Sequence, residues 1–317
     1  MWPVLEFAGA AVALIVERFV GYPQPIFEKI GHPVVWIGSL TGWADRALNR
    51  KNANRSEGRL RGVLALLLLI LASFIPAWIV AQLLDGWRIG WIIEALLATS
   101  LIAQKSMRDH VVAVYRAFDK SLPAARNAVS HIAGRDPAAL DESGIAKAAL
   151  ESLAENTSDG IVAPVFWYAV AGLPGIAVYK AINTADSMIG HKSETYLHFG
   201  WAAARLDDLV NLPCSRLTGV LFAAARPQRF QAIFAVMRRD APQHQSPNAG
   251  WPEAAMAAAL DVKFGGPRSY QGEPVELPWM GEGRATLTRH DIKRGLKLYG
   301  RAMWLLFAAL AVLGLIL

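Results

Sequence analysis

The stretch GVLALLLLILASFIPAWIVAQLL, residues 62–84, decides the fold class of this chain. It contains no charged side chain, and about 20 apolar residues in a helix cross the hydrocarbon core of a bilayer, which is about 30 Å thick. Pro76 lies inside the stretch and predicts a kink, because proline removes one helical hydrogen bond. We therefore expect a membrane-spanning helix here.

Further apolar stretches lie on both sides of this one. Residues 161–179 and 302–317 also contain no charged side chain. Residues 4–20 lack a basic leader region and a small-residue cleavage site, so we interpret them as a membrane anchor and not as a removed signal. The predicted spans are 4–20, 62–84, 89–104, 161–181, 209–225 and 302–317.

The segment 161–181 has two interpretations. The sequence Gly-Leu-Pro-Gly at residues 172–175 interrupts it. It is either a broken or re-entrant element, or a full crossing from which residues 209–225 return. Irregular backbone at membrane depth survives only where it is buried in protein or lines a cavity. We slightly favour the broken element.

The composition supports a membrane protein. Of 317 residues, 54% are hydrophobic and 18% are charged, against about 25% charged in ordinary soluble domains. Strand signals are sparse, so the predicted fold class is all-α: a polytopic integral membrane protein, one domain over residues 1–317, with helical cytoplasmic loops. The single cysteine, Cys214, excludes an intramolecular disulfide and a cysteine-cluster metal site.

Lys and Arg predict the orientation in the membrane. Residues 21–61 and 105–160 contain seven each, whereas the turn at 85–88 contains one. Because cytoplasmic loops carry the excess of Lys and Arg, we place both long segments in the cytoplasm and the N-terminus outside. The net charge of +6 then records orientation and does not indicate a nucleic-acid partner. The predicted location is the inner cell membrane, with a cytoplasmic active site.

A first polar motif is ESLAENTSDG at residues 151–160. Glu151 and Glu155 are one helical turn apart, and Asp159 continues the row. Like charges at this spacing repel each other, so a cation between them would stabilise the helix. Oxygen ligands of this kind, with Asn156 nearby, suit Mg²⁺. A solvated acidic helix end explains the spacing equally well.

Two further motifs follow the broken apolar segment. Asn183 and Asp186 are one turn apart, where polar groups tend to face a cavity, although a helix cap explains them equally well. Asp207 and Asp208, with an asparagine three residues later, could hold a metal ion that binds phosphates. From the residues alone, a charged interfacial turn in which Arg205 neutralises an aspartate is the favoured interpretation.

A fourth motif is SPNAG at residues 246–250, before an Ala-rich helix in which Pro252 is the first predicted residue. Backbone N–H groups at such a helix end can bind phosphate. Gly-Gly-Pro-Arg at residues 265–268 could form a second close-approach loop. From the residues alone, a structural turn before a stable helix is the favoured interpretation. The sequence has no Walker A motif, so an ATP site must be of another kind.

Together these motifs resemble the CbiB/CobD family of cobalamin biosynthesis, the adenosylcobinamide-phosphate synthases. The segments that carry the resemblance are ESLAENTSDGIVAP (151–164), NTADSMIG (183–190), FGWAAARLDD (199–208) and SPNAGWPEAAM (246–256). The resemblance covers nearly the whole chain from about residue 14. The early Gly-Asp-Pro box of the family reads Gly21-Tyr22-Pro23 here, with a longer insert before His32. This departure weakens a catalytic role for the aspartate of that box.

The resemblance implies that adenosylcobyric acid and 1-amino-2-propanol O-phosphate are joined to give adenosylcobinamide phosphate. ATP and Mg²⁺ are the implied cofactors, and an acyl phosphate is the expected intermediate, since a carboxylate oxygen is a poor leaving group. Corrinoid and aminoalcohol-phosphate substrates and membrane lipid are the implied partners, with other cobalamin-biosynthesis enzymes and without nucleic acid.

The resemblance also implies roles for residues of the four motifs. The implied catalytic residues are Glu151, Glu155, Asp159, Asp186 and His191, and the implied metal ligands are Glu155, Asp159, Asp207 and Asp208. The implied substrate and phosphate ligands are Asn156, Asn183, Lys192, Arg205, Ser246, Asn248, Gly250, Glu253 and Arg268. Either His191 or His244 would accept the amine proton.

Two alternative functions belong to other classes. A membrane transporter would explain the broken apolar element, but most acidic residues lie outside the predicted spans. A non-catalytic membrane sensor related to the family is the other alternative, and the intact acidic motifs argue against it.

Overall fold

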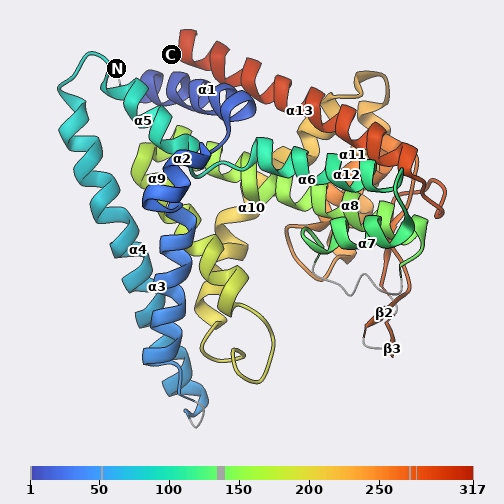
Figure 1. Cartoon of the computed structure of the whole chain (residues 1–317), viewed down its shortest axis with the longest axis horizontal. Coiled ribbons are helices and arrows are strands. Elements are labelled where there is room, and N and C mark those ends of the chain that lie inside the picture. The colour runs from blue at the N-terminus through green and yellow to red at the C-terminus, as the bar shows by residue number, and fades with distance from the viewer. Residues whose placement is uncertain (1, 51–52, 134–139, 271–272, 276, 317) are drawn as a thin grey trace. The chain divides into compact units, whose positions relative to one another are not determined.

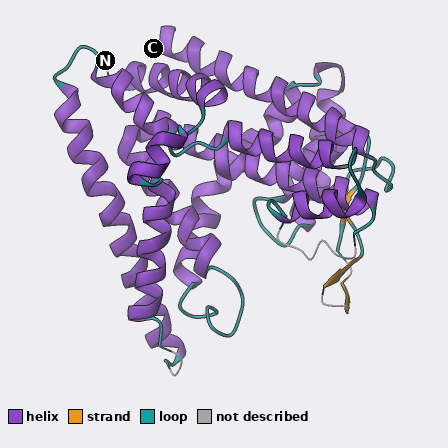
Figure 2. Ribbon diagram, viewed as in Figure 1, coloured by secondary structure: helices purple, strands orange, loops and turns teal. Residues whose placement is uncertain are grey.

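The computed structural model describes the chain except for residues 1, 51–52, 134–139, 271–272, 276 and 317. Helices dominate the described residues, and the strands among them are two or three residues long (Figure 1, Figure 2). Within the described part of the chain, three helices are long and apolar enough to cross a membrane: Arg55–Asp85, Glu142–Ile189 and Arg289–Ile316. The predicted all-α membrane fold is confirmed, while the single domain and the number of crossings stay predictions.

The chain divides into two compact units, of which the first contains Met1–Ala103, Ala163–Asn211 and Leu310–Leu317. Its helices are α1 (Trp2–Val20), α2 (Gln24–Ile30), α3 (Pro33–Leu48), α4 (Arg55–Asp85), α5 (Gly90–Thr99), α9 (Ala163–Ile189) and the first half of α10 (Trp201–Ala224). Helix α4 packs along α9, and α3 packs on both. Leu66 and Leu69 of α4 and Ile182 and Ile189 of α9 belong to the buried apolar core of this unit.

The second unit contains Gln104–Val162 and Leu212–Ala309. Its elements are α6 (Gln104–Ala117), α7 (Leu122–Ser130), α8 (Glu142–Thr157), η1 (Ser158–Val162), the rest of α10, η2 (Pro227–Arg229), α11 (Phe230–Asp240), η3 (Ala241–Gln243), α12 (Gly250–Leu260) and most of α13 (Arg289–Ile316). Strand β1 (Phe264–Gly265) pairs antiparallel with β4 (Trp279–Met280), and β2 (Arg268–Tyr270) with β3 (Glu273–Val275). Helix α12 packs against α8 and α11.

Two helix boundaries differ from the sequence prediction. The predicted span 89–104 forms helix α5 of ten residues, Gly90–Thr99, which at 1.5 Å per residue is about 15 Å long and shorter than the hydrocarbon core. Helix α12 begins at Gly250, so Pro252 is its third residue and not its first. Proline is tolerated there because the first four N–H groups of a helix have no partner inside it.

Helix α9 is interrupted at Ala171 and Gly172, where the backbone leaves the helical region. Gly172 has φ 60° and ψ −154°, a conformation that is essentially confined to glycine. Pro174 follows two residues later and cannot donate the hydrogen bond of a continuous helix. The interruption therefore lies at the Gly-Leu-Pro-Gly sequence that predicts it, and the path of this segment through the membrane stays a prediction.

A second departure from α-helical geometry is η1, a π-helix of five residues between α8 and α9. Pro164 explains its position, because in a continuous α-helix the proline ring would clash with the carbonyl of Gly160. A wider turn relieves that clash. Such π turns occur frequently at functional sites, and this one lies within the first polar motif.

The interruption at Gly172 gives a first prediction. An added Cβ would lie 2.8 Å from Glu6 Oε1 in a backbone conformation that disfavours side chains. We expect Gly172→Ala to lower the free energy of unfolding in detergent by about 1–3 kcal/mol. Gly300→Ala in α13 is the matched control, because an added Cβ there meets nothing within 4 Å and should be neutral or stabilise by up to about 1 kcal/mol. Equal stability of the two variants would contradict this explanation of the interruption.

Candidate functional site

Asp207 lies at the centre of a hydrogen-bonded network between α9 and α10. Its Oδ1 accepts from Asn183 Nδ2 at 3.3 Å, and its Oδ2 accepts from Asn211 Nδ2 at 3.0 Å. The Tyr179 hydroxyl donates to Asn211 Oδ1 at 3.0 Å, and Lys180 Nζ donates to Asn183 Oδ1 at 3.2 Å. Both amides therefore donate and accept within the network, which fixes the orientation of the Asp207 carboxylate.

Asp207 is buried, with 8% of its surface exposed. Burial raises the pKa of its carboxyl, while the hydrogen bonds from Asn183 and Asn211 and the charge of Lys180 act in the opposite direction. Each carboxylate oxygen already accepts one hydrogen bond and keeps a further lone pair. Through the network, Asp207 helps to hold α10 against α9. Its role as a metal ligand stays a prediction.

Asp208 is more exposed than Asp207 and lies near two cations. Burial raises the pKa of Asp208, and the positive charges of Arg205 and Lys192 lower it. Lys192 and His191 are exposed in the loop after α9, and Arg205 is exposed on α10. The structure therefore brings three of the predicted residues, Asp208, Arg205 and Lys192, within electrostatic reach of one another.

Asp186 lies in the last turn of α9. The Gly190 N–H donates to the Asp186 carbonyl at 2.7 Å, and a side chain at Gly190 would collide with the Asp186 carboxylate. Glycine at position 190 thus leaves room for the carboxylate over the end of the helix. A negative charge near a helix C-terminus is electrostatically unfavourable. This position disfavours the interpretation of Asp186 as a helix cap.

Glu151 is buried on α8 and holds an irregular loop. Its Oε1 accepts from the backbone N–H of Gly265 at 2.8 Å, and Lys147 donates to the Gly265 carbonyl at 3.3 Å. Lys147 Nζ also lies 4.6 Å from the ring centroid of Trp279. Gly265 and Gly266 have φ values of 70° and 75°, which glycine adopts readily, and the close approach of this loop to a phosphate stays a prediction. Glu151 therefore has a positioning contact, and its predicted catalytic role stays a prediction.

The other polar groups of the first motif lie at the end of α8 and in η1. Glu155 and Asn156 are exposed, and Asp159 is half-buried. Asn156 Nδ2 donates to the Ser152 carbonyl at 2.9 Å. The Ser158 hydroxyl is buried and has no hydrogen-bond partner among the residues that the structure describes. Such a group costs about 1–3 kcal/mol, which calls for a water molecule, ion or substrate atom as its partner.

The loop before α12 is shaped by its own side chains. Ser246 Oγ accepts from the N–H groups of Asn248 and Ala249, both at 3.2 Å. Asn248 Oδ1 accepts from Ser215 Oγ at 3.0 Å and from Arg216 Nη1 at 2.9 Å. Two N–H groups that could face a phosphate thus already have an acceptor, and the predicted phosphate contacts of Ser246 and Asn248 stay predictions.

Gly250 and Glu253 lie on the first turn of α12 and pack toward His244. A Cβ on Gly250 would lie 2.6 Å from both the Ala241 carbonyl oxygen and His244 Cβ, so this position requires a glycine. His244 Nδ1 accepts from the Ser246 N–H at 3.0 Å, and its Nε2 lies 3.8 Å from Glu253 Oε1. Both ring nitrogens of His244 therefore face groups of its own loop and helix.

Comparison with known proteins places the chain in a family. The family model described as CobD/Cbib protein matches residues 10–299. The chain belongs to the CobD/Cbib family. "Cobalamin biosynthesis protein CobD" of Rhodobacter capsulatus is 51% identical over 306 residues, which cover 94% of this chain and 95% of that protein.

Two further relatives carry the same name. The protein of Sinorhizobium fredii is 50% identical over 315 residues, which cover 97% of this chain and 96% of the relative. The protein of Brucella anthropi is 43% identical over 317 residues, which cover 96% of this chain and 97% of the relative. No solved structure matches the chain.

Three cations of this CobD/Cbib protein lie at the predicted site residues and are absent from the predicted set: Lys180 and Arg216 contact Asn183 and Asn248, and Lys147 contacts Gly265, the residue that Glu151 also binds. Lys180 lies three residues before Asn183, and Lys147 lies four residues before Glu151, so helical spacing could have identified both. Arg216 contacts Asn248 from 32 positions away in sequence, and no local pattern indicates that contact. The side chain of Arg268 lies outside the described part of the structure.

The residues of this CobD/Cbib protein fit Mg²⁺ only in company with a phosphorylated substrate. Among the described residues, no three His, Cys, Asp or Glu side chains gather into a ready-made metal site. Mg²⁺ usually takes one or two protein carboxylates and completes its shell with substrate phosphates and water. Exposed Glu155 with half-buried Asp159, or Asp208, offers such carboxylates.

The network around Asp207 gives a second prediction. Asn211→Leu leaves Asp207 Oδ2 and the Tyr179 hydroxyl without the partner that each now has. We expect it to lower the free energy of unfolding by about 1–3 kcal/mol, measured by denaturation in detergent. Asn127→Leu at an exposed position of α7 is the control and should change stability by less than about 0.5 kcal/mol. An Asn211 variant no less stable than the control would show that the network does not hold α9 to α10.

Proposed function

We propose that this protein is an adenosylcobinamide-phosphate synthase. It would join the carboxylate of adenosylcobyric acid to the amine of 1-amino-2-propanol O-phosphate, with ATP consumed. Membership of the CobD/Cbib family over residues 10–299 carries the proposal, together with relatives named for cobalamin biosynthesis. We place the enzyme in the inner cell membrane with its active site on the cytoplasmic side, where Lys and Arg are in excess.

The chemistry of amide formation defines what the protein must supply. A carboxylate oxygen of the corrinoid attacks the γ-phosphorus of ATP, which forms an acyl phosphate and releases ADP. The amine then attacks the acyl carbon, the bond from carbon to the phosphate oxygen breaks, and inorganic phosphate leaves. The proton lost by the amine passes to a base. The protein must therefore provide cationic groups for the phosphoryl oxygens and a proton acceptor.

Arg205 and Lys192 are the proposed phosphate ligands of the first unit. Both are exposed and lie within electrostatic reach of Asp208. A guanidinium offers paired N–H donors that match the oxygens of a phosphate, and an ammonium adds a point charge. The Asp186 carboxylate, placed over the end of α9 by Gly190, would orient the amine substrate through its positive charge.

Glu155 and Asp159 are the proposed carboxylates for a metal ion in the second unit. Bound Mg²⁺ would neutralise phosphoryl charge and so favour transfer to the corrinoid carboxylate. The half-buried position of Asp159 in the π turn, beside the unpartnered Ser158 hydroxyl, supports this assignment. In the first unit, Asp207 and Asp208 are the carboxylates that we propose as ligands of a metal ion.

Of the two candidate histidines, His191 and His244, we propose His191 as the base that accepts the proton of the amine. The Nδ1 atom of His244 already accepts from the Ser246 N–H, and its Nε2 faces Glu253. His191 is exposed beside Lys192, where an incoming amine phosphate would be attracted. The loop 246–250 would bind phosphate through its remaining backbone groups, with Arg216 contributing a charge from its position 4.6 Å over the Trp251 ring.

The proposed reaction is tested on the purified full-length protein in detergent. Incubation with adenosylcobyric acid, 1-amino-2-propanol O-phosphate, ATP and Mg²⁺ should give adenosylcobinamide phosphate, detected by mass spectrometry. Omission of ATP or of Mg²⁺ should abolish the product. Failure of the folded protein to form any amide under these conditions would overturn the proposal.

Single variants test the carboxylates as a third prediction. We expect Glu155→Gln and Asp208→Asn each to reduce kcat about 100-fold or more, since each removes a carboxylate that would hold Mg²⁺ against the transferring phosphoryl group. Asp109→Asn on α6 is the matched control, because the Asp109 side chain is 44% exposed and pairs with Lys105 and Arg108 of its own helix. Turnover of Glu155→Gln equal to that of the control would remove Glu155 from the site.

Glu151 gives a fourth prediction, because a glutamine at this position keeps an oxygen that can accept from Gly265. We expect Glu151→Gln to retain turnover within about tenfold, a change of about 1.4 kcal/mol in the barrier. Glu151→Leu leaves the buried Gly265 N–H without its acceptor and should lower the free energy of unfolding by about 1–3 kcal/mol. A large loss of turnover in a stable Glu151→Gln protein would instead assign Glu151 a catalytic role.

A further inference from the structure

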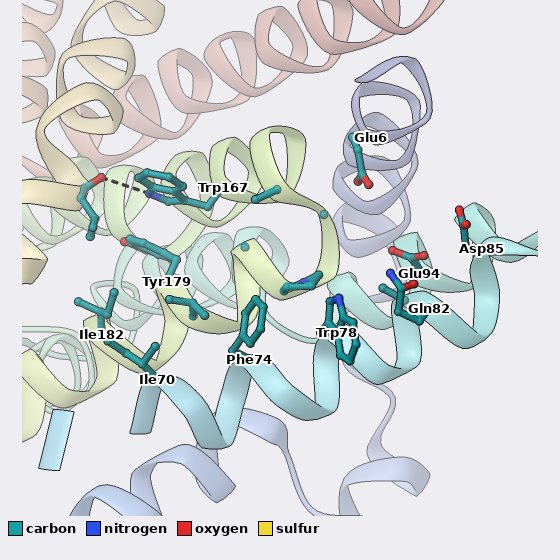
Figure 3. A pocket seen from close by; sticks show the side chains of 17 residues that line it. Glu6, Ile70, Phe74, Trp78, Gln82, Asp85, Glu94, Trp167, Tyr179 and Ile182 are labelled. Carbon is teal, nitrogen blue, oxygen red and sulfur yellow. Dashed lines mark hydrogen bonds between the residues drawn. The ribbon is translucent and has the colours of Figure 1, made fainter. Parts of the chain in front are cut away.

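A cavity of about 980 Å³ lies in the first unit among helices α1, α4, α5 and α9 (Figure 3). Its lining follows α4 from Ile70 to Asp85, a distance of roughly 22 Å at 1.5 Å per residue. None of the residues proposed for amide formation lines it. Tyr179, which bonds to Asn211 in the Asp207 network, lines the cavity at the end away from Asp85 (Figure 3), so the acidic end is distinct from the residues proposed for amide formation.

One end of the cavity is acidic. Glu6, Asp85 and Glu94 line this end (Figure 3), and no Lys, Arg or His is among the described residues that line the cavity. The backbone N–H of Leu173, directly after the interruption of α9, donates to the Glu94 carboxylate. A carboxylate in largely apolar surroundings is costly, and a cationic ligand at this end of the cavity would offset that cost.

The rest of the cavity is apolar and open along α4. Phe74 and Trp78 of α4 line one side, facing Val178 and Ile182 of α9. Phe74 and Trp78 are 39% and 48% exposed, so the side formed by α4 is not sealed. Little of the apolar surface of α4 is buried within the protein. In a bilayer, lipid chains surround this helix and have access to the cavity.

The acidic end lies where headgroups are expected. Asp85 is the last residue of α4, and Glu94 lies in the first turns of α5. Trp87 in the turn between them is 62% exposed, as is typical of aromatic side chains at a membrane interface. The distribution of Lys and Arg places this turn on the outer side. A ligand with its cation here would reach the apolar part from the outer leaflet.

We propose that this cavity binds a phospholipid with a primary-amine headgroup, of the phosphatidylethanolamine type. An ammonium carries N–H donors that can bind to carboxylates at the acidic end of the cavity, which Glu6, Asp85 and Glu94 line. Gln82 and Trp78 line the cavity beside them and offer neutral N–H donors to the lipid phosphate. One acyl chain would lie along α4 toward Ile70.

Other occupants match the cavity less well. A trimethylammonium headgroup has no N–H to donate to carboxylates, and an anionic headgroup would meet three negative side chains. A metal ion alone would leave the apolar part empty, and the described residues form no ready-made metal site. The lipid site does not depend on the proposed synthase reaction.

The site is tested with the full-length protein reconstituted in nanodiscs that contain equal amounts of phosphatidylethanolamine, phosphatidylcholine and phosphatidylglycerol. Lipids retained after transfer to mild detergent are counted by native mass spectrometry. We expect phosphatidylethanolamine to be retained about tenfold over phosphatidylcholine, which corresponds to one charge-assisted contact of about 1.4 kcal/mol. Equal retention of the two lipids, or preference for phosphatidylglycerol, would overturn the proposal.

Two kinds of variant test separately what the acidic end and the apolar part of the cavity contribute to lipid binding. The double variant Glu6→Gln with Glu94→Gln should lose the preference for phosphatidylethanolamine, whereas Glu28→Gln at an exposed position of α2 should keep it. Ala81→Trp places bulk in the cavity lining and should reduce lipid retention while all three carboxylates remain. A preference for phosphatidylethanolamine that survives the double variant would contradict the proposal. A second measurement adds soluble dodecylamine to the detergent-solubilised protein. Binding of dodecylamine by a protein that shows no preference among the three lipids would indicate an amine site and contradict a lipid site.

Discussion

Backbone N–H and C=O groups inside a bilayer must find partners within the protein, because hydrocarbon offers none. The long helix Glu142–Ile189 departs from α-helical geometry at two places, the π turn at Ser158–Val162 and the interruption at Ala171 and Gly172. A proline follows each departure, at positions 164 and 174. Irregular backbone of this kind needs polar groups or a cavity beside it. Asp159 lies in the first departure, and the second bonds to Glu94 and lines a cavity.

The sequence motifs mix residues that shape the protein with residues that remain available to substrates. Glu151, Asp207 and Asn248 each use a side-chain oxygen to hold another segment in place. Glu155, Lys192 and Arg205 are exposed. A motif contains both kinds of residue, and the sequence does not distinguish them. The contacts in the structure show which side chains hold another segment in place.

The sequence alone was sufficient for features that depend on local patterns. Uncharged runs predicted the long apolar helices, and Gly-Leu-Pro-Gly predicted the interruption of α9, because both follow from backbone chemistry within a few residues. The contact between Arg216 and Asn248 joins residues 32 positions apart, and the acidic end of the cavity joins Glu6 to Glu94. Such pairs arise from tertiary packing, which no local pattern encodes. The short helix α5 was missed for a related reason, since apolar composition does not specify where a helix stops.

If ATP activates the corrinoid carboxylate for attack by the amine, one oxygen of that carboxylate must leave with phosphate. The most direct measurement uses adenosylcobyric acid whose carboxylate carries a heavy oxygen isotope, with mass spectrometry of the inorganic phosphate released during turnover. Transfer of one labelled oxygen to inorganic phosphate for each amide formed is the predicted result. Label found in AMP, or amide formation with no label in phosphate, would contradict an acyl-phosphate route in this protein.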